Sequence, residues 1–112
     1  MAGLTPADVN VLACYDPFTI VSLMQIEDMG FCAKGDGGRF VEGNTLHFDS
    51  GKLPYNTHGG MLSHAYVLGI AHVVEVVKQL RGSAAAQVPD CEVGVYGGYT
   101  GAHASTLVLT RS

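Results

Sequence analysis

The longest apolar segment of the chain runs from Ala65 to Leu80. Its apolar positions fall on every side of a 3.6-residue helix instead of on one stripe: Ala65, Val67, Leu68, Ile70, Ala71, Val73, Val74, Val76, Val77 and Leu80. A helix that is apolar all round is normally a buried helix. The segment is too short, and too interrupted by His64, His72 and Glu75, to span a membrane. The pattern therefore predicts a helix buried between layers of the protein.

The first third of the chain predicts a strand followed by a helix. Thr5 precedes a proline and begins a helix of a turn or two. The segment from Val9 to Tyr15 is short, apolar and β-prone, which is typical of a strand buried on both faces. Asp16 and Pro17 stop this strand and cap a helix over Phe18 to Met29.

The remaining segments predict a hairpin and two strands. Residues 40–48 alternate well enough for a small irregular hairpin. Residues 91–96 and 104–110 are apolar and β-prone, and the loop between them contains glycines that expose backbone N–H groups. The order strand, helix, hairpin, helix, strand, strand predicts an α/β fold with a mixed sheet.

The composition fits one domain over residues 1–112 with one face covered by another chain. Hydrophobic residues make up 47% of the sequence and charged residues only 14%, which is little charge for the surface of so small a protein. The net charge of −4, with scattered Lys and Arg, argues against nucleic acid as a partner. No secretory signal is visible, and no segment predicts attachment to a membrane.

The three cysteines, Cys14, Cys32 and Cys91, have neither CxxC nor metal-ligand spacing. They indicate a reducing compartment, and we expect a cytoplasmic protein without a metal site. His64 and His72 are two turns apart, too far to share a metal without a third ligand. The glycine-rich residues 32–39 lack the GK[ST] ending of a phosphate loop, so a surface loop is the favoured interpretation.

The positions of three residues in the sequence make them candidates for a catalytic role. His58 precedes the buried helix, whose positive end would keep it neutral and able to exchange a proton; a loop-stabilising histidine is the alternative. Tyr66 is predicted in the first turn of that helix, either facing the site or buried with a satisfied hydroxyl. Tyr15 ends the first strand, where α/β proteins often place site residues; a packed core tyrosine is the alternative.

Motifs along most of the chain resemble the C-terminal half of thiolase-superfamily enzymes, especially the sterol-carrier-protein type. The family's His-Asp-Cys-Phe motif matches residues 15–18, Tyr-Asp-Pro-Phe, and its Leu-Gly-Phe/Leu-Cys-x-x-Gly-x-Gly-Gly segment matches residues 29–38. Its Asn-Pro-x-Gly-Gly motif matches Asn-Thr-His-Gly-Gly at 56–60, and its Gly-His-Pro motif matches Ala-Tyr-Val at 65–67. The resemblance implies a thiolase-like mixed sheet with a buried central helix.

The departures from the family pattern bear on the reaction. Tyr66 and Tyr15 stand where the family has residues that help to form an oxyanion hole for the thioester. Val95 stands where some members have a second catalytic cysteine. The nucleophilic cysteine belongs to the N-terminal half of the family fold, which this sequence lacks. The resemblance therefore implies that ordinary thiolysis is lost and that the chain is inactive alone.

The Asn-Thr-His-Gly-Gly and Ala-Tyr pattern resembles a subset of thiolase-like proteins that act on bulky acyl-CoA thioesters, some as retro-aldol lyases. For these the resemblance implies Tyr66 as acid/base or enolate stabiliser, with His58 beside it and Tyr15 as pocket wall or second donor. Gly97 would donate its backbone N–H to the thioester oxygen. The substrate-binding residues implied are Asn56, Gly59, Gly60, Gly97 and Gly98.

The same resemblance implies the partners. Coenzyme A thioester is the expected substrate, with no covalently bound cofactor. The expected protein partners are a second copy or an N-terminal thiolase half, and an OB-fold acyl-CoA-binding protein. The sequence leaves acyl transfer, such as acetyl-CoA acetyltransferase activity, and retro-aldol cleavage both open. A non-catalytic module that scaffolds an acyl-CoA-binding complex is the alternative function.

Overall fold

The computed structural model describes residues 2–112, and its central element is a three-stranded mixed sheet. In chain order the elements are η1 (Pro6–Asp8), β1 (Val11–Cys14), α1 (Thr19–Asp28), α2 (Gly37–Phe40), α3 (Gly60–Ser63), α4 (Ile70–Arg81), β2 (Val93–Tyr99) and β3 (Ala104–Thr110). Strands lie in the order β1-β2-β3, with β1 parallel to β2 and β2 antiparallel to β3. Tyr55 forms a further parallel bridge to Leu12 on the free side of β1. The predicted α/β fold with a mixed sheet is confirmed.

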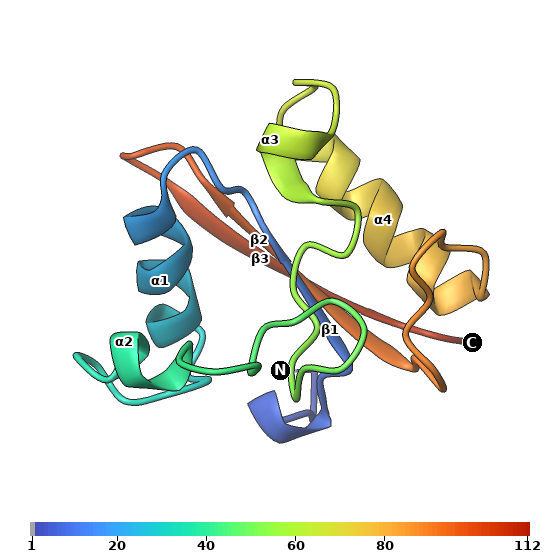
Figure 1. The fold of residues 1–112 in the computed structure, drawn as a ribbon, viewed down its shortest axis with the longest axis horizontal. Coiled ribbons are helices and arrows are strands. Elements are labelled where there is room, and N and C mark those ends of the chain that lie inside the picture. The colour runs from blue at the N-terminus through green and yellow to red at the C-terminus, as the bar shows by residue number, and fades with distance from the viewer. Residues whose placement is uncertain (1) are drawn as a thin grey trace.

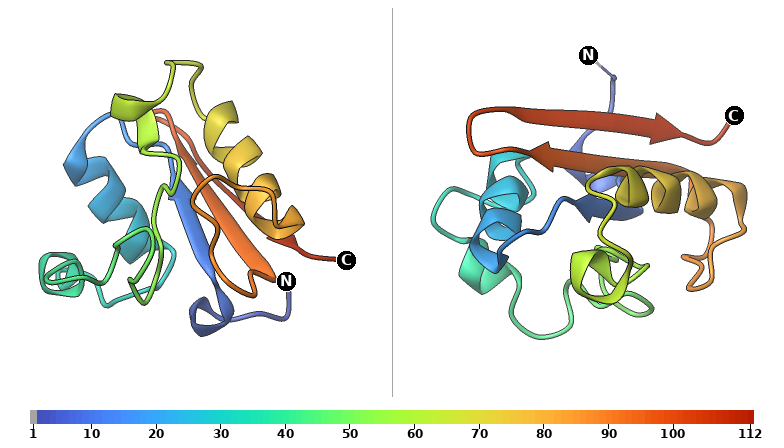
Figure 2. Two further views of the ribbon diagram at one scale, coloured as in Figure 1. Left: turned by 45° about the vertical axis from the view of Figure 1, so that its right-hand side comes forward. Right: turned by 90° about the horizontal axis from the view of Figure 1, so that it is seen from above.

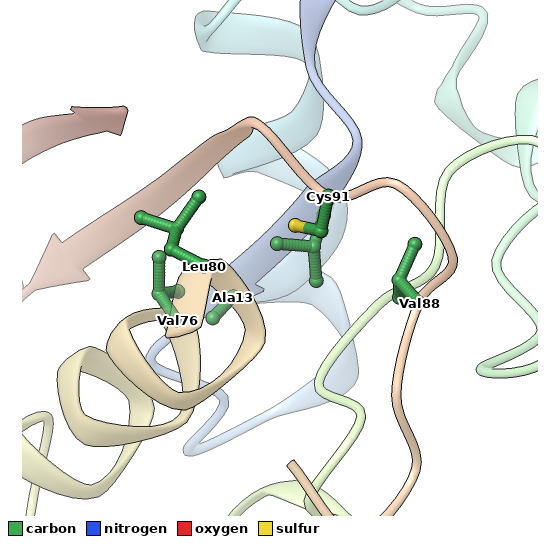
Figure 3. Packing of buried hydrophobic residues seen from close by; sticks show 6 residues of the cluster. Ala13, Val76, Leu80, Val88 and Cys91 are labelled. Atoms are coloured by element: carbon green, nitrogen blue, oxygen red, sulfur yellow. The ribbon is translucent and has the colours of Figure 1, made fainter. Parts of the chain in front are cut away.

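Helices α1 and α4 cover opposite faces of the sheet (Figure 1). Side chains alternate between the two faces of a strand, so the four buried residues of β1 divide between two cores. Val11 and Ala13 pack with Val76 and Leu80 of α4 (Figure 3). Leu12 and Cys14 belong to the second core, which includes Ile26 of α1 and Val95 of β2; further members are Leu53 and the partly buried Met29 and Phe31.

Strand β3 forms the outer edge of the sheet, and both of its faces are largely exposed (Figure 2). Its pairing runs from Ala104 opposite Tyr99 to Thr110 opposite Val93. Leu107 and Val108 are both substantially exposed on this strand. Leu109 packs against the core under α4, whereas the exposure of Leu107 and Val108 is not explained by packing within the described chain.

The helix predicted over residues 65–80 begins later than expected. Residues 65–69 are irregular, and α4 starts only at Ile70. Leu68 has a φ of 59°, a left-handed value that a β-carbon-bearing residue adopts at a cost, so the backbone cannot continue there as a right-handed helix. The placement of Tyr66 in the first turn of the helix was therefore wrong.

Helix α4 buries polar as well as apolar residues against the sheet. The polar ones are His72, Glu75 and Gln79. Its outer face is apolar only near its beginning, where Ile70 is 58% and Val74 45% exposed, and Lys78 and Arg81 are exposed toward its end. The helix predicted to be buried between layers is thus covered on one side only within the single chain. Its covering by another chain stays a prediction.

Two of the buried polar residues of α4, Glu75 and Gln79, form a hydrogen-bonded network with Thr57 and the chain that follows the helix. The Thr57 hydroxyl donates to a Glu75 carboxylate oxygen at 2.6 Å, and the Gln79 amide donates to the Thr57 hydroxyl at 2.9 Å. The amide N–H of Val88 donates to the Gln79 side-chain oxygen at 2.8 Å. These bonds offset the cost of burying the two side chains, whereas Nδ1 of the buried His72 has no hydrogen-bond partner within residues 2–112.

Two local predictions on the N-terminal side need correction. The hairpin predicted over residues 40–48 does not form; α2 and a series of turns occupy this region, held by backbone hydrogen bonds such as Leu53 N to Thr45 O at 3.0 Å. Phe40, Val41 and Leu46 pack against the second core instead of pairing in a sheet. Asp16 does not cap α1, since Phe18 occupies the N-cap position.

The division into two cores predicts a strong effect of truncating β1. Leu12 is 0% exposed and Leu62 is 98% exposed. Leu12→Ala is expected to lower the free energy of unfolding by about 2–5 kcal/mol, because it leaves a cavity between β1 and α1. Leu62→Ala is the matched control and should change it by less than about 0.5 kcal/mol. Equal denaturation midpoints for the two variants would contradict the assigned core.

Candidate functional site

The candidate site lies where the carboxyl ends of β1 and β2 meet the beginnings of α1 and α4. Ligands of α/β proteins commonly bind at the carboxyl ends of parallel strands. A groove with a volume of 620 Å³ opens there, and its lining residues are Tyr15, Pro17, Phe18, Val21, Leu68, Gly69, Tyr96, Gly98, Tyr99, Thr100, Gly101, His103, Ala104 and Ser105. The positive ends of both long helices point toward this region and favour a partial negative charge on a bound group.

Tyr15 is held at the end of β1 by hydrogen bonds of its backbone and of its hydroxyl. Its backbone N–H donates to the Gly97 carbonyl at 2.8 Å, and its carbonyl accepts from the Gln25 side chain at 2.9 Å. Its hydroxyl lies 3.0 Å from the hydroxyl of Tyr66. This hydrogen bond, followed by partial burial, raises the pKa of Tyr15 above its ordinary value. The two candidate tyrosines are thus brought together.

Asp16, the next residue, joins β1 to two helices. One carboxylate oxygen lies 2.9 Å from Nε2 of the fully buried His72 on α4. The carboxylate also accepts from the Met61 N–H at 3.2 Å, at the beginning of α3. Gly60 permits this arrangement, because a β-carbon there would collide with the Asp16 carboxylate and because its φ is +67°.

His58 lies near two other histidines, and its predicted place beside Tyr66 stays a prediction. Its ring centroid is 4.7 Å from that of His72 and 5.4 Å from that of His64, both edge-on. Burial, and then the neighbouring His72, lower the pKa of His58. It lines a second groove of 540 Å³ together with Asp16, Asn56 and Thr57. His58 is not among the residues that line the groove beside Tyr15.

Asn56 and Gly59 shape the backbone around the site. The Asn56 side chain accepts from the Cys14 N–H at 2.9 Å and donates to the Cys14 carbonyl at 3.1 Å, so it completes the sheet at the end of β1. Its φ is +42°, which asparagine tolerates better than most residues. Gly59, with a φ of +97°, is the N-cap of α3. Both residues position the chain, and their predicted role in substrate binding stays a prediction.

Gly97 and Gly98 fall on opposite faces of β2. A β-carbon on Gly97 would lie 2.7 Å from the buried Gln25 side chain, so this glycine faces α1 and does not line the groove. Gly98 does line it, on the same strand face as Tyr96. Tyr96 lies over Gly69, where any β-carbon would collide with the Tyr96 hydroxyl. Burial raises the pKa of Tyr96.

The sequence reasoning missed Asp16, His72 and Tyr96 as parts of the site. Tyr96 had a signal, since it lies two residues before Gly98 on the same strand and therefore on the same strand face. The contact between Asp16 and His72 joins residues 56 positions apart and depends on how α4 packs, so no local pattern indicates it. In residues 2–112 no group of three metal-ligating side chains is close enough to hold an ion, and no helix is long and apolar enough to cross a membrane.

The lowered pKa of His58 predicts how stability depends on pH. The folded state disfavours the protonated ring, so the unfolded chain binds more protons as the pH falls below about 6.5, the ordinary histidine value. The part of the stability due to neutral His58 is present above this pH and is lost below it. His58→Gln should therefore flatten the fall in urea midpoint between about pH 7.5 and pH 5. An identical fall in both proteins would contradict this.

Comparison with known proteins places these features in a family. The model of the family described as thiolase C-terminal domain-like matches residues 1–111. A 17-hydroxy-3-oxo-4-pregnene-20-carboxyl-CoA lyase of Mycobacterium tuberculosis is 42% identical over 96% of this chain and 28% of its own length. An acetyl-CoA acetyltransferase of Methanothermobacter thermautotrophicus is 39% identical over 99% of this chain and 30% of its own.

A solved structure agrees with the sequence comparisons. A chain of a structure described as Ltp2-ChsH2(DUF35) aldolase superposes with a TM-score of 0.91 at 38% identity, covering 97% of this chain and 28% of that one. The present sequence thus spans less than a third of the length of these relatives. From the match of the family model and the shared fold, the chain belongs to the thiolase C-terminal domain-like family.

Proposed function

We propose that the chain is the C-terminal domain of a carbon–carbon lyase that cleaves a β-hydroxyacyl-CoA of lipid or steroid type. The observation that carries this proposal is the pair of hydroxyls of Tyr15 and Tyr66, 3.0 Å apart at the carboxyl end of the sheet. Relatives named as a pregnene-carboxyl-CoA lyase and as a steroid side-chain-cleaving aldolase support the substrate class.

The proposed reaction is a retro-aldol cleavage. The β-hydroxyl loses its proton, its oxygen forms a carbonyl, and the bond between the α and β carbons breaks. The electron pair moves into the thioester as an enolate, which then takes up a proton to give the shortened acyl-CoA. The products are an aldehyde or ketone and an acyl-CoA, so the step needs neither an oxidant nor a reductant. The protein must move a proton and stabilise negative charge on oxygen.

The two phenols suit these tasks. Tyr15 keeps its proton at neutral pH, as an ordinary tyrosine does and as its raised pKa reinforces, and acts as a hydrogen-bond donor to the developing charge. Tyr66, more exposed at 66%, is the acid/base group that exchanges protons with the substrate. The nearby beginnings of α1 and α4 add the positive ends of two helix dipoles to the same region. His58, held neutral by burial, stays a candidate for a supporting role.

The cysteines favour cleavage over acyl transfer by this chain. Covalent acyl transfer needs an accessible thiol with a lowered pKa. Burial raises the pKa of Cys14 to about 12, and burial also raises the pKa of Cys91 and of Cys32. A nucleophilic thiol for thiolysis would therefore have to come from another part of the enzyme.

Activity is expected only in an assembly. We infer a partner that supplies the missing N-terminal half, or a second copy, and an OB-fold protein that binds the acyl-CoA. The exposed Ile70 and Val74 at the beginning of α4, together with the exposed Leu62, Val67 and Leu68 that precede the helix, support a protein interface. Coenzyme A enters as part of the substrate and not as a resident cofactor.

Replacing Tyr66 tests the proposal. In the assembled enzyme, Tyr66→Phe should lower the rate of β-hydroxyacyl-CoA cleavage by about 10²–10⁴-fold, the usual contribution of a positioned proton donor or acceptor. The measurement is steady-state release of the carbonyl product. A β-ketoacyl-CoA with free CoA, assayed in parallel, reports thiolysis.

Tyr55→Phe is the matched control, because the Tyr55 hydroxyl donates to Ser22 on α1 and not to the groove. It should lose about 1 kcal/mol of stability and keep its activity. Full activity of Tyr66→Phe would refute the proposed role, and thiolysis without β-hydroxyacyl-CoA cleavage would refute the reaction.

A non-catalytic scaffold is the second candidate, and the extent of the exposed apolar face favours it. Leu62, at 98% exposure, has no packing role in the described chain. A scaffold should bind its partner with unchanged affinity when Tyr66 and His58 are both replaced, and no mixture should show activity. Cleavage activity that depends on Tyr66 would exclude this alternative.

A further inference from the structure

The two edges of the sheet differ in how their backbone groups are satisfied. The Leu12 N–H donates to the Pro54 carbonyl, and the Leu12 carbonyl accepts from the Asn56 N–H, both at 3.0 Å. The Asn56 side chain bonds both backbone groups of Cys14, so the free side of β1 is closed. Strand β3 forms the opposite edge, and Figure 2 shows it as the outermost strand of the sheet. Within residues 2–112 no further strand pairs with β3, so this edge is open.

The register with β2 shows which backbone groups of β3 face the open edge. The Thr100 N–H donates to the His103 carbonyl at 2.9 Å. The Arg111 N–H donates to the Glu92 carbonyl at 2.8 Å. Because hydrogen-bonded pairs alternate along an antiparallel ladder, the odd-numbered residues of β3 bond to β2. The N–H and C=O groups of the even-numbered residues therefore point outward: Ala104, Thr106, Val108 and Thr110.

Strand β3 also lacks the features by which exposed edges normally avoid pairing. Such edges are usually short, or they contain charged residues, proline or a bulge. Residues 104–110 consist of Ala, Ser, Thr, Leu and Val, and their register with β2 is unbroken. Leu107 is 42% and Val108 38% exposed, one on each face of the strand. The edge therefore combines open hydrogen-bonding groups with exposed apolar side chains.

The sequence of β3 is complementary to itself in the antiparallel direction. With Leu107 on a twofold axis, Thr106 lies opposite Val108 of a second copy, and Ala104 lies opposite Thr110. Every outward N–H and C=O group then meets a partner, which gives about eight hydrogen bonds, two for each hydrogen-bonded pair. The two Leu107 side chains meet on one face, and residues 104–110 bring no like charges together.

We propose that β3 pairs with β3 of a second copy, so that the two sheets form one continuous sheet around a twofold axis. Because β1 is closed, each chain has one open edge, and the pairing ends at a dimer instead of continuing into a fibre. The exposed Leu62, Val67 and Leu68 stay free for the remaining part of the enzyme. The pairing does not depend on the proposed reaction, and it can be measured on the 112-residue chain without any activity.

Sedimentation equilibrium of the 112-residue chain tests the pairing. We expect a monomer–dimer equilibrium with a dissociation constant of about 1–100 µM, as for a small, transient interface. Thr106→Pro removes an outward N–H and leaves the bonds to β2, so it should weaken dimerisation about tenfold or more with little change in urea midpoint. Thr106→Val keeps the N–H and is the matched control, which should dimerise as well as the unmodified chain. A chain that stays monomeric throughout this concentration range, or that forms larger oligomers, would overturn the inference.

A variant on another surface and a second measurement show where the contact lies. Leu62 lies in α3 and is 98% exposed, so Leu62→Lys should leave the dissociation constant unchanged. Amide hydrogen exchange of Val108 should be slow in the dimer and fast in the dilute monomer, whereas the Leu107 amide, bonded to β2, should be slow in both. Loss of the dimer in Leu62→Lys, or equal exchange of Val108 at both concentrations, would overturn the inference.

Charge at the ends of the strand tests the register. In the proposed pairing the exposed His103 lies opposite Arg111 of the second copy, twice across the axis. His103→Glu should therefore tighten the dimer and His103→Lys should weaken it, so that their dissociation constants differ about threefold or more. With Arg111→Ala added to both variants, this difference should disappear. A difference that persists without Arg111 would contradict the register.

The outcomes are separable from those of the proposed function. Dimerisation through β3 with no cleavage in any assembly would leave the pairing standing and refute the lyase. If an added N-terminal half displaced the second copy and kept the Val108 amide protected, β3 would be an interface within the enzyme, and the inference would be wrong.

Discussion

The arrangement of the site depends on two side chains that fix the carboxyl end of β1. The Asn56 side chain bonds both the N–H and the carbonyl of Cys14. It therefore satisfies the backbone groups of the last residue of β1 in the way that a neighbouring strand would. Two residues on, the Asp16 carboxylate holds His72 of α4 and the N–H of Met61 at the start of α3. Tyr15 lies between these anchors and has little freedom to move. Loss of either anchor would release the hydroxyl pair that the proposed chemistry requires.

The proposed assembly would use the beginning of helix α4 as a contact surface. The buried polar groups Glu75 and Gln79 of this helix are satisfied within the chain. Ile70 and Val74 are exposed at its beginning, whereas Lys78 and Arg81 are exposed toward its end. The exposed apolar residues of α4 and β3 are therefore the surface on which the proposed partner would pack.

The sequence alone was sufficient to predict the elements that depend on the local pattern of residues. The buried run of β1, helix α1 and the strands β2 and β3 follow from apolar periodicity and from proline and glycine positions. The late start of α4 was not predictable, because it depends on a left-handed Leu68 that composition does not indicate. The pairing of Tyr15 with Tyr66, 51 residues apart, was expected only in outline, and the anchoring of Asp16 by His72 was not expected, because both depend on tertiary packing.

The hydrogen bond between the Tyr15 and Tyr66 hydroxyls is tested most directly by titrating the phenols. In the folded chain labelled with ¹³Cζ-tyrosine, the Tyr15 signal, assigned from Tyr15→Phe, should titrate with a pKa above the ordinary value of about 10, because the bond to Tyr66 is the main cause of its rise. In Tyr66→Phe the pKa of Tyr15 should fall back toward that value. The same pKa for Tyr15 in both proteins would contradict the arrangement on which the proposed function rests.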